Sequence, residues 1–179
     1  VMIKPLGLLT AKPIIYATNV SEDDLAEGNA FSTEVVELAA KEGAETVRIS
    51  AQVEAELIEL GDDERADYLE GLGVSEGGLQ SLIQATYRLL GLRTYFTTGE
   101  KETRAWTFKA GMTAPQAAGV IHTDFERGFI RAQTIGWEKL IEAGSLAEAR
   151  NKGWLRSEGK EYVVDAVSYT HLRAHETLP

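Results

Sequence analysis

Two short apolar runs on either side of a helix-patterned segment constrain the fold of this chain more than any other feature. The runs cover residues 13–18 and 46–49; both are too short for a helix and rich in β-branched side chains. Between them, Ser32 can cap a helix whose apolar residues follow helical spacing, and Gly43 can end it. Strand, helix and strand in this order predict a right-handed crossover with a parallel strand pair.

Polar residues follow both predicted strands. Asn19 and Glu22 follow the first strand, and Ser50 and Ala51 follow the second. The carboxyl ends of parallel strands form the ligand edge of such sheets, and an Asn amide can bond a purine while backbone N–H groups near Ser50 meet its exocyclic group. An Asn followed by an acid is also an ordinary turn or helix-start signal, so spacing alone leaves both interpretations open.

The remaining pattern predicts three further helices and then a second domain that begins near Gly91. An alternating, aromatic hairpin and a mixture of short helices and strands indicate a small α+β sheet. The expected helices cover residues 53–60, 62–73, 79–90, 114–121 and 137–151, and the expected strands cover residues 92–97, 104–108, 129–135 and 162–164.

The charge also divides along the chain. Residues 1–91 hold 6 Lys and Arg against 17 Asp and Glu, whereas residues 92–179 hold 12 against 11. Two modules with different partners would explain this asymmetry. Solvated helix faces would equally explain the acids of the first part.

Composition excludes several kinds of site. The chain has no cysteine, which rules out disulfides, thiolate zinc sites and cysteine nucleophiles. No apolar run approaches the roughly 18 residues of a membrane span, and residues 1–10 lack signal-peptide features, so we expect a cytoplasmic protein without membrane contact. His122 has a carboxylate two residues on, but His171 and His175 lie in an atypical tail; we predict a structural histidine and no metal site.

A group of cations in the second part is a candidate contact for RNA. Arg127, Arg131 and Lys160, with Lys152 and Arg156 nearby in sequence, accompany aromatic residues in a nearly neutral domain. This composition suits contact with a phosphate backbone, although scattered solvated cations are an equally valid interpretation. We expect Trp106 in the core rather than at a base-stacking surface.

Several segments resemble the YchF or Obg-like ATPase family. They are residues 12–22, which contain the Asn-x-x-Glu of Asn19 and Glu22, and residues 92–99, 104–107, 114–132 and 158–164. Together they cover nearly all of residues 1–164, and the match at 114–132 is highly specific.

The resemblance implies a fold and a function. It implies an α/β fold, in which part of a P-loop NTPase (Rossmann-like) parallel-sheet domain at residues 1–91 precedes a β-grasp TGS domain of α+β type at residues 92–164. It further implies a ribosome-associated protein that binds ribosomal RNA, without DNA specificity, and hydrolyses ATP, or also GTP, with Mg²⁺. By the same resemblance Asn19, Val20 and Glu22 bind the base, and Ser50 and Ala51 support it.

The sequence departs from the family pattern twice. It contains no Gly-x-x-x-x-Gly-Lys-Ser/Thr, so we expect a C-terminal fragment without catalytic residues, inactive alone, whose magnesium ligands lie in the missing N-terminal part. Residues 165–179 differ from the family's final strand and resemble translated sequencing-adapter read-through, so we expect a non-native tail and a TGS sheet that lacks its last strand. The alternative function is a nucleotide-independent TGS adaptor that binds RNA or protein.

Overall fold

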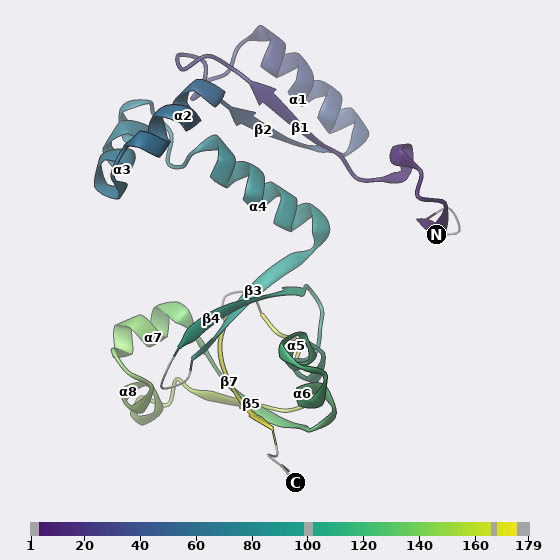
Figure 1. Ribbon diagram of the computed structural model, residues 1–179, viewed down its shortest axis with the longest axis vertical. Helices are drawn as coiled ribbons and strands as arrows, with labels where there is room; N and C mark the ends of the chain where they lie inside the picture. The colour runs from purple at the N-terminus through teal and green to yellow at the C-terminus, as the bar shows by residue number, and fades with distance from the viewer. Residues whose placement is uncertain (1–3, 99–101, 166–167, 175–179) are drawn as a thin grey trace. The chain divides into compact units, whose positions relative to one another are not determined.

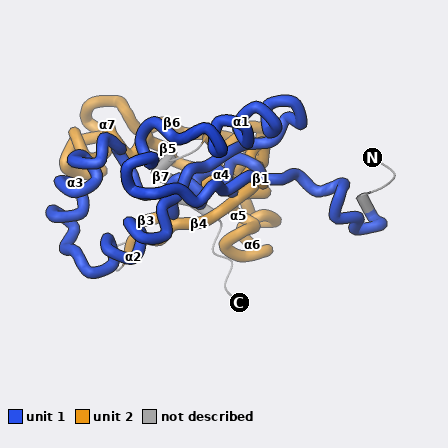
Figure 2. Tube along the Cα trace, turned by 90° about the horizontal axis from the view of Figure 1, so that it is seen from above, with its two compact units in different colours: residues 1–89 blue, residues 90–179 orange. Residues whose placement is uncertain are grey.

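The computed structural model describes residues 4–98, 102–165 and 168–174. It divides the chain into two compact units, Val1–Leu89 and Leu90–Pro179, which Figure 2 shows in different colours. Among the described residues, no helix has the length and apolar character needed to cross a membrane.

Unit 1 is built on the predicted strand, helix and strand. After two short 3-10 turns at Lys4–Leu6 and Leu9–Ala11, β1 (Ile15–Asn19) pairs in parallel with β2 (Glu45–Ile49), and α1 (Ala30–Glu42) connects them (Figure 1). The pairing runs from Ile15 opposite Glu45 to Asn19 opposite Ile49, so both strands end at the same edge. The parallel pair that the sequence predicts is therefore present.

The start of α1 differs from the prediction by three residues. Asn29, not Ser32, is the cap, because its side chain accepts the Ser32 N–H at 3.0 Å while the Ser32 hydroxyl accepts the Asn29 N–H at 2.9 Å. This reciprocal pair satisfies two N–H groups that a helix start leaves without partners. Gly43 ends the helix with φ of 68°, as predicted.

Three further helices complete unit 1: α2 (Ala51–Glu59), α3 (Asp62–Gly71) and α4 (Gly78–Leu90). The turn after β1 packs on α2 through a buried cluster of Val20, Leu25, Val53 and Leu57, against which side chains of α3 such as Tyr68 are packed. This cluster fixes the loop after β1 to α2 and α3, and so it positions the candidate site.

Unit 2 contains a five-stranded mixed sheet in the order β4-β3-β7-β5-β6. Its strands are β3 (Leu92–Thr98), β4 (Thr103–Lys109), β5 (Phe129–Gly136), β6 (Arg156–Glu158) and β7 (Ser168–Ala174), and its helices are α5 (Ala114–Ile121), α6 (Thr123–Arg127), α7 (Trp137–Ala143) and α8 (Leu146–Asn151). Figure 1 shows α5 and α6 on one side of the sheet and α7 and α8 on the other. One core joins Tyr95, Phe108 and Ala117, and a second joins Ile135 and Ala149.

Three elements of unit 2 differ from the sequence prediction. The helix expected over residues 137–151 is divided at Gly144, whose φ of 74° ends α7, and α6 was not predicted. The strand expected at residues 162–164 is wrong: Val164 N–H bonds the Met112 carbonyl, and the Tyr162 carbonyl accepts the Ala114 N–H, so this segment pairs with the turn before α5. The strand that pairs with β5 in this part of the chain is β6, which the sequence did not predict.

The sheet also contains a strand where the sequence predicted none. Residues 168–174 form β7, which pairs in parallel with β3 and antiparallel with β5. A gap between two strands presents unpaired N–H and C=O groups to any extended segment, whatever its side-chain pattern. The expectation that the sheet lacks its last strand is therefore wrong for residues 168–174. The non-native origin of residues 165–179 stays a prediction, and residues 166–167 and 175–179 lie outside the described residues.

Candidate functional site

The carboxyl ends of β1 and β2 are joined by one side chain. Asn19, the last residue of β1, is exposed, and its Oδ1 accepts the backbone N–H of Ala51 at 2.9 Å. The Val20 N–H donates to the Ile49 carbonyl at 2.8 Å, which continues the strand pairing beyond Asn19. Because Oδ1 is engaged, the amide nitrogen of Asn19 is the end that can donate to a purine.

Ser50 and Ala51 form the start of α2 beside Asn19. Ser50 is 1% exposed, and its hydroxyl caps α2 by accepting the Val53 N–H at 3.5 Å. Ala51 is exposed and contributes its backbone N–H to the Asn19 bond. The side chain of Ser50 thus has a structural role, and the site receives the positive end of a nine-residue helix.

A short network fixes the turn that carries Glu22. Asp24 accepts hydrogen bonds from the amide of Asn29 and the hydroxyl of Ser21, both at 2.8 Å. These two bonds, the one from Asn29 first, hold the pKa of Asp24 below its usual range. Glu22 is half-buried in this turn. Asp24 was not singled out from the sequence, because its role depends on a partner beyond the turn.

Tyr68 of α3 lies between two carboxylates. Its hydroxyl donates to Glu56 of α2, and its ring packs on the cluster that holds Val20. The hydrogen bond to Glu56 comes first among the causes that raise the pKa of Tyr68 to about 12, followed by desolvation and the charge of Glu22. The hydroxyl therefore lies near Glu22 as well. Sequence reasoning missed Tyr68, since no local pattern connects α3 with residues 19–22.

The position of Val20 restricts its role. Its side chain is 8% exposed and belongs to the core cluster with Val53 and Leu57. The structure thus brings Asn19, Glu22, Ser50 and Ala51 to one end of unit 1, but it turns the side chain of Val20 into the core. Any contact of residue 20 with a base would come from its backbone.

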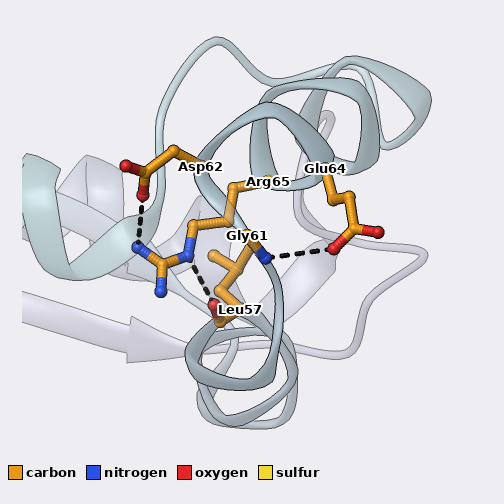
Figure 3. A network of polar contacts seen from close by, with 5 residues as sticks. All are labelled: Leu57, Gly61, Asp62, Glu64 and Arg65. Carbon is orange, nitrogen blue, oxygen red and sulfur yellow. Dashed lines mark hydrogen bonds and ion pairs between the residues drawn. The ribbon is translucent and has the colours of Figure 1, made fainter.

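Polar contacts connect α2 and α3 where the two helices meet (Figure 3). Arg65 Nε donates to the Leu57 carbonyl at 2.7 Å, and Arg65 Nη1 lies 3.3 Å from Asp62 Oδ1. The Gly61 N–H donates to Glu64 Oε2 at 3.0 Å. The bond from Arg65 to Leu57 ties the first turn of α3 to the last turn of α2, and the other two contacts stabilise the start of α3.

The candidate RNA-contact residues Arg127, Arg131 and Lys160 are all exposed in unit 2. Arg127 ends α6, and Arg131 lies near the start of β5. The antiparallel pairing of β5 with β6 ends where Ala132 is opposite Glu158, and Lys160 lies in the turn that follows β6.

Other sequence candidates have structural contacts. Arg156 stacks on the Tyr162 ring, 5.7 Å from its centroid, and lies 3.3 Å from a Glu158 oxygen. His122 Nδ1 accepts the Asp124 N–H at 3.2 Å and so caps α6. Trp106 is half-buried against the first core of unit 2, as the sequence predicts.

Comparison with known proteins connects both units to one family. The family model described as "YchF-GTPase_C: Protein of unknown function (DUF933)" matches residues 92–174. A Bacillus subtilis (strain 168) protein named "Ribosome-binding ATPase YchF" is 52% identical over 174 residues, which cover 96% of this chain and 48% of that protein. The protein of the same name from Escherichia coli O157:H7 is 52% identical over 162 residues, which cover 90% of this chain and 44% of that protein. This chain therefore spans about half the length of the curated relatives that it matches.

Solved structures are similar over the same extent. The chain superposes on the Schizosaccharomyces pombe YchF GTPase with a TM-score of 0.82 and 34% identity, covering 96% of this chain and 46% of that one. A GTP-binding protein from Pyrococcus horikoshii OT3 gives a TM-score of 0.63 at 21% identity, covering 91% of this chain and 46% of that one; at this identity the likeness concerns the fold alone.

Proposed function

The chain belongs to the YchF family, and on that premise we propose that it is the C-terminal part of a cytoplasmic, ribosome-associated protein that hydrolyses ATP, and also accepts GTP. In this proposal unit 1 is the base-recognition half of a P-loop NTPase domain, and unit 2 is a TGS domain of β-grasp type. The parallel pair of unit 1 and the mixed sheet of unit 2 support this division.

The bond between Asn19 and Ala51 carries the proposal. It joins the ends of two parallel strands at the edge where α/β sheets bind ligands, and it leaves the amide nitrogen of Asn19 for a purine. Glu22, in the next turn, adds a carboxylate near the same edge. These residues fit a base, and no residue of this chain takes a catalytic role in the proposal.

The phosphates and Mg²⁺ require residues outside this chain. A glycine-rich loop that ends in Lys-Ser or Lys-Thr would hold the β- and γ-phosphates, and Mg²⁺ would neutralise the charge that develops during hydrolysis. Within unit 1, Asn19 and Ala51 would orient the nucleotide by its base.

In unit 2, we assign Arg127, Arg131 and Lys160 to contact with ribosomal RNA. The exposure of all three residues and the location of Arg127 and Arg131 around the start of β5 support this assignment, as does the name of the curated relatives. Charged contacts of this kind carry most of the affinity for a nucleic-acid backbone.

The decisive experiment replaces Asn19 by Ala in the intact protein and measures ATP affinity by calorimetry. We expect a loss of about tenfold or more, because an unmet polar group in such a site costs roughly 1–3 kcal/mol. Asn151→Ala in unit 2 is the control, with no expected change. An intact protein that binds ribosomes but no nucleotide would replace this proposal with the nucleotide-independent adaptor.

A further inference from the structure

We infer that Arg150 and Lys152, with Arg131, form a phosphate-binding stripe for RNA on the α8 side of unit 2. The inference rests on the proposed function, because it extends the proposed contact with ribosomal RNA. The sequence alone grouped Arg131 with Lys152 but did not connect Arg150 with them, since Arg150 belongs to α8 and Arg131 to β5.

Strand alternation places Arg131 on the α8 side of the sheet. Along β5, Ala132 belongs to the core beneath α5, whereas Ile135 packs with Ala149 of α8. The irregular pairing of β5 ends at Arg131, so the alternation from there onward is regular. Arg131 and Gln133 therefore share the face of Ile135.

Arg150 reaches the same face from α8. It follows the fully buried Ala149, and its Nη2 donates to Gln133 Oε1 at 3.4 Å. Gln133 lies two residues from Arg131, about 7 Å along the strand. Both arginine side chains are exposed. The amide of Gln133 thus holds the Arg150 guanidinium over the strand that carries Arg131, while the remaining donors of Arg150 stay available to phosphate oxygens.

Lys152 lies just beyond the end of α8. Its Nζ is 4.6 Å from the centroid of the Trp154 ring, and Trp154 packs on the core of Ile135 and Ala149. This cation–π contact holds the lysine on the α8 side. Because the side chain is already ordered, binding costs it less conformational entropy. Cations from β5, α8 and the following loop therefore meet on one face.

RNA fits this stripe better than an acidic protein surface. Two guanidinium groups on one face can each pair with phosphate oxygens in a bidentate manner, and an ordered lysine adds a point charge. Glu158 pairs with Arg156, whereas Glu148 accepts a bond from the neutral amide of Asn151 and keeps its charge. Three cations against the one carboxylate of Glu148 leave the stripe with a net positive charge.

The test is the double variant Arg150→Gln with Lys152→Gln in the intact protein, measured by co-sedimentation with ribosomes over a salt series. We expect severalfold weaker binding at low salt, and a slope of log K against log salt that is shallower by about 0.7 for each lost phosphate contact. Lys139→Gln, on the exposed part of α7, is the matched control and should change neither quantity. Thermal melting of each variant verifies that unit 2 stays folded.

Each outcome decides between the inference and its premise. Normal binding by the double variant, together with weak binding by Arg127→Glu with Arg131→Glu, would overturn the stripe and retain the proposed ribosome contact. Normal binding by both variants would overturn both. If the double variant lost ribosome binding but bound purified ribosomal RNA normally, the stripe would contact a ribosomal protein, and the assignment to RNA would be wrong.

Discussion

At the residue scale, Tyr68 makes the free energy of unfolding of unit 1 depend on pH in the alkaline range. The hydrogen bond to Glu56 raises its pKa from 10.0 to about 12, so the folded state keeps the phenol protonated when the unfolded chain would lose that proton. A raised pKa contributes stability that is fully present below pH 10 and is lost as the pH rises through 12. We predict that Tyr68→Phe removes this part of the pH dependence.

The measurement is urea unfolding of the chain between pH 9 and pH 12, followed by circular dichroism. Tyr162→Phe in unit 2 is the matched control, because it should leave the alkaline dependence of unit 1 unchanged. Equal pH dependence in the wild type and Tyr68→Phe would show that the contact with Glu56 adds no stability.

Glu22 allows a second prediction at this scale, on the choice of nucleotide. Guanine presents N1–H and an amine that a short carboxylate can accept as a pair, whereas adenine lacks both donors. Glu22 is one methylene longer than the Asp of GTPases, so we expect the intact protein to prefer ATP, and Glu22→Asp to shift the preference toward GTP by up to about tenfold. Competition binding with both nucleotides measures this shift.

The core position of Val20 decides how this experiment is designed. A Val20→Lys change would put a cation into the cluster that contains Val53, which is 0% exposed, and the loss of stability would obscure any effect on specificity. Glu22→Asp alone avoids this problem, and Asp23→Glu in the same turn controls for the change of one methylene. A wild-type preference for GTP would remove Glu22 from its assigned role.

At the scale of elements, local patterns predicted most of the fold. The parallel pair, α2 to α5 and the hairpin of β3 and β4 follow from spacing and end signals. The errors fall where tertiary contacts decide. In the sequence, Gly144 is a single residue of low helix propensity within a helical pattern, but in the structure it ends α7. Residues 162–164 have the pattern of a strand but pair with the turn before α5. The ends of β1 and β2 could be placed from sequence, whereas Tyr68 could not, because α3 reaches them only in the folded state.

The strand β7 gives a prediction at this scale. It lies between β3 and β5, so a chain that ends at Asp165 would leave both inner edges of the sheet without a partner. We expect this truncation to lower the melting temperature of unit 2 and to promote aggregation, and we expect faster amide exchange in β3 and β5. Removal of residues 175–179 alone is the control. Unchanged exchange in the truncated chain would show that residues 168–174 are dispensable, in agreement with the prediction of a non-native tail.

At the scale of the whole molecule, the charge asymmetry follows the division into units. Val1–Leu89 contains all 17 Asp and Glu residues counted in the first part of the sequence. The nearly neutral Leu90–Pro179 contains the proposed phosphate-binding stripe. Charge repulsion makes unit 1 a poor surface for RNA, so we assign RNA contact to unit 2 alone. The sequence predicted this separation because net charge is additive along the chain, whereas the stripe of Arg131, Arg150 and Lys152 depends on how β5 and α8 pack.

The last prediction concerns nucleotide binding by these 179 residues alone. Unit 1 presents groups for a base, but the sequence contains no Gly-x-x-x-x-Gly-Lys-Ser/Thr, and the charge-assisted bonds to the phosphates supply most of the affinity for a triphosphate. Each such bond contributes about 1.5–3 kcal/mol, so the loss of several weakens binding by roughly a thousandfold or more. We therefore expect calorimetry on the purified chain to detect no ATP binding tighter than about 1 mM, with or without Mg²⁺, and no hydrolysis. The intact protein, measured in parallel, should bind ATP far more tightly. Micromolar binding by the 179 residues alone would mean that unit 1 holds the phosphates itself, and the assignment of base recognition to Asn19 and Ala51 would then need a different ligand pose.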